Sequence, residues 1–129
     1  MSKGKILVVD DEPDIVRSLS IRLGSAGYEV STAGDGLNAT RKAIDEQPDL
    51  ILLDIGMPAG NGHEVVERLS NIGETSHIPI IYLTACTSAE DYRKASEGGV
   101  CKFITKPFDS EILLTAVEDQ INHSRLVAR

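Results

Sequence analysis

Hydrophobic and polar positions along the chain follow two alternating patterns. Short runs rich in β-branched and aliphatic residues lie at 6–9, 28–32, 50–53, 78–83 and 102–105. The runs at 6–9, 50–53 and 78–83 are apolar nearly throughout, which is typical of parallel strands covered on both faces. The run at 28–32 mixes in polar residues and is expected at a sheet edge. This part of the pattern predicts five β-strands.

Between these runs, apolar residues recur with the period of a helix, and each stretch opens with a recognisable start signal. These signals are Pro13, Asp35, Asn61, Thr87 and Asp109. Five strand-then-helix units in succession predict an α/β domain with right-handed crossovers and helices on both faces of the sheet. The expected fold is a flavodoxin-like, doubly wound parallel sheet of five strands in the order 2-1-3-4-5, with five helices.

Composition and charge narrow the class of protein. The chain has 129 residues, of which 41% are hydrophobic and 26% charged, so a single globular domain spanning 1–129 is expected. The net charge of −7 disfavours direct binding to nucleic acid or to an anionic membrane surface. No apolar run approaches the roughly 18 residues that span a bilayer, and the N-terminal apolar run is too short for a signal peptide. A cytoplasmic protein is therefore expected.

Polar residues stand at the carboxyl ends of four predicted strands. Asp10 and Asp11 follow the first run, Asp54 follows the third, Thr84 follows the fourth, and Lys106 follows the fifth. Each alone could simply begin a loop, because Asp and Thr favour turns. Ligands of open α/β sheets bind beyond the carboxyl ends of the strands, where the winding reverses. The joint placement therefore predicts a functional site.

The residue types at this edge indicate phosphoryl chemistry on a metal. Two carboxylates about 4 Å apart repel by about 4 kcal/mol at an effective dielectric constant of 20, so three clustered carboxylates need a cation or a proton. Oxygen ligands open to water and phosphate favour Mg²⁺. Asp54 stands alone and is the candidate nucleophile, forming an aspartyl phosphate, while Asp10 and Asp11 are suited to hold metal. Thr84 can donate a hydroxyl hydrogen bond to a phosphoryl oxygen, and Lys106 offers a positive charge.

The motifs that carry these residues resemble those of a known family. The chain has Asp10-Asp11, Asp54-x-x-Met57-Pro58, Thr84-Ala85 and Lys106-Pro107-Phe108, in that order. Over residues 4 to 124 it resembles the receiver domain of bacterial two-component response regulators. The resemblance implies a signalling switch, not a turnover enzyme. Its phosphoryl donor would be a sensor histidine kinase or a phosphotransfer protein, and its acceptor Asp54.

The resemblance also implies the ligand set and the switch. Mg²⁺ would be held by Asp11, Asp54 and the main-chain carbonyl of Gly56, with Asp10 acting through water. The residues expected to bind the phosphoryl group or to switch with it are Thr84, Ala85, Lys106 and Phe103. The peptide bond before Pro107 is expected to be cis. The partner surface would be the face made by the fourth helix, fifth strand and fifth helix.

Two other functions fit parts of the sequence. A Mg²⁺-dependent phosphatase with an aspartyl-phosphate intermediate would carry its nucleophile in an Asp-x-Asp motif after the first strand. Here Asp10 and Asp11 are adjacent, and no insertion resembles a substrate cap. A binding module that does not use phosphorylation is the other alternative, and the complete set of acidic, hydroxyl and lysine residues speaks against it. Two cases fit the sequence: a stand-alone receiver, or a piece of a longer regulator or hybrid kinase.

Overall fold

The computed structural model describes residues 3–54, 62–84, 102–105 and 109–127, and within them it forms one parallel sheet. The strands are β1 (Lys5–Val9), β2 (Glu29–Ala33), β3 (Leu50–Leu53), β4 (Ile80–Thr84) and β5 (Lys102–Thr105). Their spatial order is β2-β1-β3-β4-β5, with every neighbouring pair parallel. The predicted doubly wound sheet and its strand order are confirmed.

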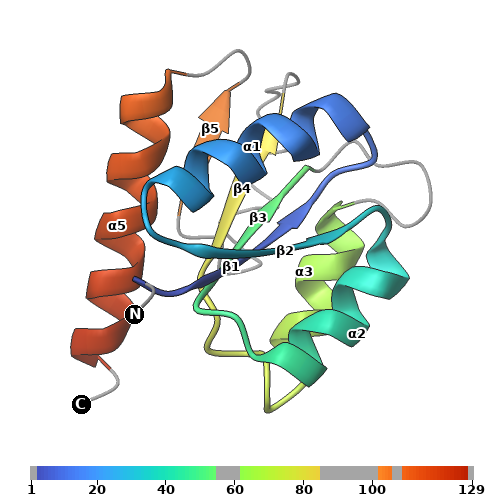
Figure 1. Ribbon diagram of the computed structural model, residues 1–129. Coiled ribbons are helices and arrows are strands. Elements are labelled where there is room, and N and C mark those ends of the chain that lie inside the picture. Colours follow the sequence, from blue (N-terminus) through green and yellow to red (C-terminus); the bar gives the residue numbers. More distant parts are fainter. Residues whose placement is uncertain (1–2, 55–61, 85–101, 106–108, 128–129) are drawn as a thin grey trace.

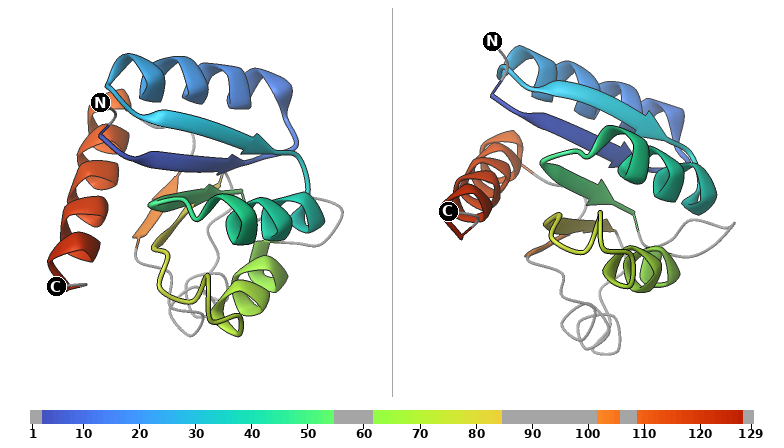
Figure 2. Two further views of the ribbon diagram at one scale, coloured as in Figure 1. Left: turned by 60° about the horizontal axis from the view of Figure 1, so that its bottom comes forward. Right: turned by 90° about the horizontal axis from the view of Figure 1, so that it is seen from below.

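Helices cover both faces of the sheet. The described helices are α1 (Pro13–Ser25), α2 (Gly36–Glu46), α3 (Gly62–Ser70) and α5 (Ser110–Val127). Helices α1 and α5 lie on one face, and α2 and α3 lie on the other (Figure 1 and Figure 2). The predicted helix that follows Thr87 lies outside the described residues.

The hydrophobic core consists of two layers, one on each side of the sheet. Along β1, Leu7 and Val9 face the layer made with α2 and α3, whereas Ile6 and Val8 face the layer made with α1 and α5. This follows from the strand period of two, which points successive side chains to opposite faces. All residues of β3 are buried, whereas β2 at the sheet edge has an exposed first residue, Glu29, and three half-buried ones. The predicted difference between interior and edge strands is confirmed.

The start of α2 follows its predicted signal, and a backbone motif ends α1. Asp35 caps α2, its Oδ1 accepting a hydrogen bond of 2.8 Å from the Asn38 main-chain N–H. Helix α1 ends in a Schellman motif, in which the Tyr28 N–H donates to the Leu23 carbonyl (3.0 Å). Gly27 adopts a φ of 102° there, a backbone conformation that residues with a Cβ rarely take. The connection between the end of α1 and the start of β2 is therefore a tight turn.

An ion pair fastens α2 to the sheet at the amino-terminal end of β1. Lys5 Nζ lies 2.7 Å from Glu46 Oε1, and the Ser31 hydroxyl donates to Glu46 Oε2 at 3.2 Å. The hydrogen bond with Lys5 is the main cause that holds the pKa of Glu46 below its ordinary value. The same hydrogen bond is the main cause that raises the pKa of Lys5. This pair occupies the edge of the sheet opposite Asp10 and Asp54.

The helices were compared with what a membrane-spanning helix requires. Within residues 3–54, 62–84, 102–105 and 109–127, none combines the length and the apolar character that crossing a bilayer requires.

Candidate functional site at the carboxyl edge of the sheet

Strands β1 and β3 bring Asp10 and Asp54 to the same edge of the sheet. The two strands pair in parallel, with Val9 opposite Leu53, so the two aspartates follow at adjacent positions. The Asp54 N–H donates to the Val9 carbonyl at 2.9 Å, and the Asp10 N–H donates to the Ala33 carbonyl of β2 at 3.1 Å. Strand β1 thus lies between β2 and β3 where the winding reverses, as the predicted topology requires.

Both of these carboxylates are buried. Asp10 is 3% exposed and Asp54 is 8% exposed, and among the described acidic residues these two are the buried ones. Burying a carboxylate is costly unless other groups stabilise it, so such residues are uncommon outside functional or structural polar sites. Two of them at neighbouring strand ends mark this edge as the candidate site.

The loop after β1 adds two exposed carboxylates to the buried pair. Carboxylate oxygens of Asp10, Asp11 and Glu12 all lie within 4.8 Å of one another. Asp10 Oδ1 also accepts a hydrogen bond of 3.0 Å from the Glu12 main-chain N–H, which orients the buried carboxylate. The predicted ligand set of Asp10, Asp11, Asp54 and Gly56 does not include Glu12. The signal was available, because three consecutive acidic residues follow the strand directly.

The donor atoms at this edge suit a hard divalent cation. The side chains of Asp10, Asp11 and Asp54 offer only carboxylate oxygens, which Mg²⁺ prefers over nitrogen or sulfur ligands. Asp10 and Asp54 are buried, whereas Asp11 is exposed and remains open to water. Asp10 and Asp11, which lie together with Glu12, therefore fit the expected cation by their chemistry, whereas Asp54 at the adjacent strand end is not part of that close group.

Strands β4 and β5 end at the same edge. Thr84 pairs with Thr105 and Tyr82 pairs with Phe103 in the parallel register. The structure therefore places the main chains of Thr84 and Phe103 where the sequence predicted. The remaining predicted features lie outside what the structure describes: Gly56, Ala85, Lys106, Pro107 and the side chains of Thr84 and Phe103. Their roles stay predictions.

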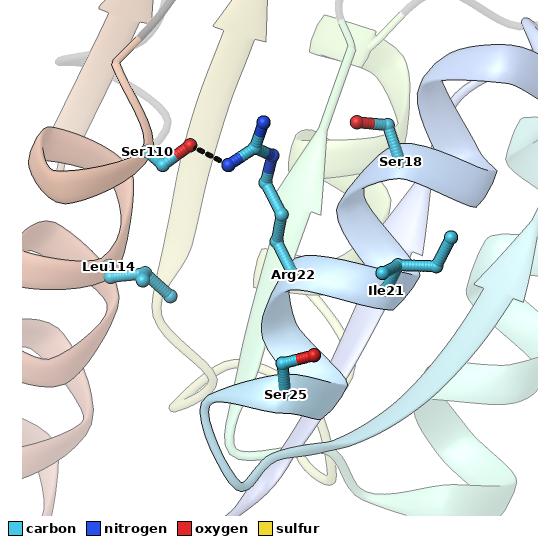
Figure 3. Close-up of a pocket in the computed structure, with 6 residues that line it drawn as sticks. All are labelled: Ser18, Ile21, Arg22, Ser25, Ser110 and Leu114. Carbon is cyan, nitrogen blue, oxygen red and sulfur yellow. Dashed lines mark hydrogen bonds between the residues drawn. The ribbon is translucent and has the colours of Figure 1, made fainter.

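A groove lies between α1 and α5, away from the acidic edge (Figure 3). It measures about 470 Å³ and is lined by Ser18, Ile21, Arg22, Ser25, Ser110 and Leu114. The Arg22 guanidinium donates a hydrogen bond to the Ser110 hydroxyl across it. A second depression of about 440 Å³ runs along α3, lined by Glu64, Glu67, Arg68, Asn71 and Ile72. Neither is lined by Asp10 or Asp54.

Comparison with known families decides what this arrangement is. The family model of the response regulator receiver domain matches residues 6–118, which include both strand-end aspartates. The chain belongs to this family. The resemblance noted from the motifs is thereby confirmed.

Curated relatives of this receiver domain are longer proteins. It is 40% identical over 113 residues to the DNA-binding dual master transcriptional regulator RpaA of Synechocystis, covering 88% of this chain and 47% of that protein. It is 40% identical over 124 residues to the alkaline phosphatase synthesis transcriptional regulatory protein PhoP of Bacillus subtilis, covering 96% of this chain and 51% of that protein. The chain thus spans about half the length of these relatives.

Solved structures share the fold of the receiver domain over nearly its whole length. The chemotaxis protein CheY4 of Vibrio cholerae is 36% identical, with a TM-score of 0.86 over 90% of this chain and 97% of that one. A CheY-like receiver domain protein from Methanospirillum hungatei is 27% identical, with a TM-score of 0.91 over 96% of this chain and 98% of that one. These likenesses agree with the flavodoxin-like sheet described above.

Proposed function

We propose that this receiver domain is a phosphoryl-accepting switch in which Asp54 takes a phosphoryl group from a sensor histidine kinase or a phosphotransfer protein. The observation that carries the proposal is the pair of buried carboxylates, Asp10 and Asp54, at adjacent strand ends beside the exposed Asp11. Family membership supports the same function. We take residues 1–129 as a single receiver domain that acts in the cytoplasm.

Asp54 is the proposed nucleophile because it stands alone at the end of β3. Its carboxylate oxygen forms the new bond to phosphorus as the bond from phosphorus to the donor's histidine nitrogen breaks. The electron pair of the broken bond stays on that nitrogen. Asp54 is 8% exposed, so little water solvates its carboxylate. A poorly solvated carboxylate loses less hydration when it attacks the phosphorus of a docked donor.

The proposed Mg²⁺ ligands are Asp10, Asp11, Asp54 and the main-chain carbonyl of Gly56. Bound Mg²⁺ supplies positive charge that offsets the carboxylates and the phosphoryl oxygens. One oxygen of Asp10 already accepts the Glu12 N–H, so Asp10 offers chiefly its second oxygen, directly or through water. Asp11 is exposed and can reorient toward a ligand without breaking the sheet.

The switch is proposed to run through the ends of β4 and β5. Thr84 and Ala85 would bind the phosphoryl oxygens together with Lys106, and the Phe103 side chain would change rotamer with them. We further propose a cis peptide bond before Pro107. The result would be a changed surface around the fourth helix, β5 and α5, which alters the affinity for a partner.

The output is proposed to be a protein partner or an output domain, not direct contact with nucleic acid. The net charge of −7 opposes binding to a phosphate backbone. RpaA is described as DNA-binding, but this chain covers only 47% of it, so that activity is not carried over to the receiver domain.

Acetyl phosphate with Mg²⁺ provides the direct test. The wild-type chain is expected to gain the mass of one phosphoryl group, Asp54→Asn to gain none, and the exposed-surface control Glu67→Gln to behave as wild type. An equal gain in Asp54→Asn would overturn the assignment. Multiple turnover on a phosphate ester, lost in Asp10→Asn but kept in Asp54→Asn, would instead indicate the phosphatase.

A further inference from the structure

Strand β2 lies at one end of the sheet, so one of its two edges has a neighbouring strand and the other has none among the described residues (Figure 2). Hydrogen bonds identify the edge that faces β1. The Glu29 N–H donates to the Gly4 carbonyl at 2.9 Å, and the Ala33 carbonyl accepts from the Asp10 N–H at 3.1 Å. Residues 29 and 33 therefore direct these main-chain groups toward β1.

The main-chain groups between these two positions alternate in direction. In a parallel pair, every second residue of a strand bonds to the same neighbour, so Ser31 also faces β1. The N–H and C=O groups of Val30 and Thr32 then point to the outer edge of β2. Unpaired edge groups of this kind are a template on which a further strand can add. The outer edge of β2 is thus open to pairing unless another group covers it.

A side chain of α2 covers this edge. The Lys42 ammonium group donates a hydrogen bond to the main-chain carbonyl of Thr32, and Lys42 is half-buried. One turn further along α2, Glu46 accepts a hydrogen bond from the Ser31 hydroxyl at 3.2 Å. Two residues of the same helix therefore bond to β2. A strand that approached the outer edge would meet a positive charge and an acceptor that is already in use.

A second copy of this chain carries a strand that matches this edge. Two β2 strands can pair antiparallel about a two-fold axis at Ser31, with Val30 of one copy exchanging N–H and C=O bonds with Thr32 of the other. Each exchanged pair uses one Thr32 carbonyl, which is the group that Lys42 occupies. The pairing would also bring two ammonium groups to one interface, where like charges repel.

We infer that Lys42 closes the outer edge of β2 and so prevents the chain from pairing through this strand with a second copy. Lysine side chains at sheet edges are a known way of blocking such pairing. Here the lysine comes from the adjacent helix, so the edge stays closed only while α2 is packed against the sheet. The inference does not depend on phosphoryl transfer.

The first experiment measures self-association of the full chain by sedimentation equilibrium over a wide range of protein concentrations. Lys42→Ala frees one acceptor on each copy, and we expect its association constant to exceed that of wild type about ten- to thirtyfold. Lys42→Arg can still donate to the carbonyl and should behave as wild type. Arg41→Ala removes the same charge from the neighbouring exposed position of α2 and should also behave as wild type.

A second experiment locates the contact by amide hydrogen exchange, which does not require a further variant. In Lys42→Ala the N–H groups of Val30 and Thr32 should become protected as the protein concentration rises, whereas in wild type they should exchange rapidly throughout. Val30→Pro in the Lys42→Ala background removes one outward N–H and should abolish the added association, because proline is tolerated at an edge position that donates no bond to the sheet.

A loss of stability could cause association by a different route, so a destabilised control is needed. Val66→Ala shortens a buried side chain of α3 and leaves the outer edge of β2 unchanged, and it should associate no more than wild type. The inference would be overturned if Lys42→Ala associated no more than wild type. Association without protection of the Val30 and Thr32 N–H groups, or equal association in Val66→Ala, would overturn it as well.

Discussion

Asp54→Asn tests the electrostatics of the acidic edge without any phosphoryl donor. Neighbouring strands lie about 4.8 Å apart, and two unit charges at that separation would repel by about 3.5 kcal/mol at an effective dielectric constant of 20, which sets an upper scale for the carboxylates at the ends of β1 and β3. Asparagine keeps the shape of the side chain and removes one of the two charges. We expect the variant to exceed wild type in free energy of unfolding by about 1 to 3 kcal/mol in EDTA.

Mg²⁺ should narrow this difference. A ligand present at 100 times its dissociation constant adds about 2.7 kcal/mol to the free energy of unfolding of a protein that binds it only when folded. Wild type should gain this amount. The variant lacks one proposed ligand, and a tenfold weaker affinity alone would reduce its gain by about 1.4 kcal/mol.

Urea unfolding followed by far-ultraviolet circular dichroism measures both effects, and it suits a chain that contains no tryptophan. Glu67→Gln removes an exposed carboxylate of α3 and is expected to respond to Mg²⁺ as wild type does. If Asp54→Asn were less stable than wild type in EDTA and gained as much from Mg²⁺, the reasoning would be refuted. The two carboxylates would then neither repel appreciably nor share a cation.

Two further predictions concern stability away from the site. Asp35→Ala removes the cap of α2 and should lower the free energy of unfolding by about 1 kcal/mol. Asp35→Asn can still cap the helix and should lower it far less. A urea titration measures both variants, and equal losses would argue against a capping role. The ion pair of Lys5 and Glu46 should make wild type more stable than Glu46→Gln at neutral pH. This advantage should vanish as the pH falls below 4.5, through the lowered pKa of Glu46, because the carboxylate is then protonated. It should also vanish as the pH rises above 10.5, through the raised pKa of Lys5, because the ammonium group then loses its proton. Thermal unfolding across pH measures this difference, and an advantage that persisted at both extremes would contradict it.

Much of the fold could be predicted from local pattern. The apolar runs of β1, β3 and β4 and the helical periodicity between them specify strand–helix units, because each periodicity buries a face only in its own secondary structure. The right-handed crossover rule then leaves few ways to wind five such units. The same reasoning put Asp10 and Asp54, which are 44 positions apart, at one edge of the sheet.

Other features depend on contacts between distant segments, which local pattern does not encode. The sequence presents Asp10, Asp11 and Glu12 as equivalent acidic neighbours, yet the structure buries Asp10 and exposes the other two. The reason is that Asp10 still follows the line of β1 between β2 and β3, whereas the chain then turns outward into α1.

The hydrogen bond between Arg22 and Ser110 is another feature that the sequence does not predict and the tertiary structure decides. Nothing near either residue in the sequence indicates the other, because the contact depends on how α1 and α5 pack on the same face of the sheet (Figure 1). The sequence by itself therefore determined the elements, their winding and the strand ends that carry the chemistry. The tertiary structure decided which carboxylates are withdrawn from water and which helices touch, because both are set by packing between elements far apart in the chain.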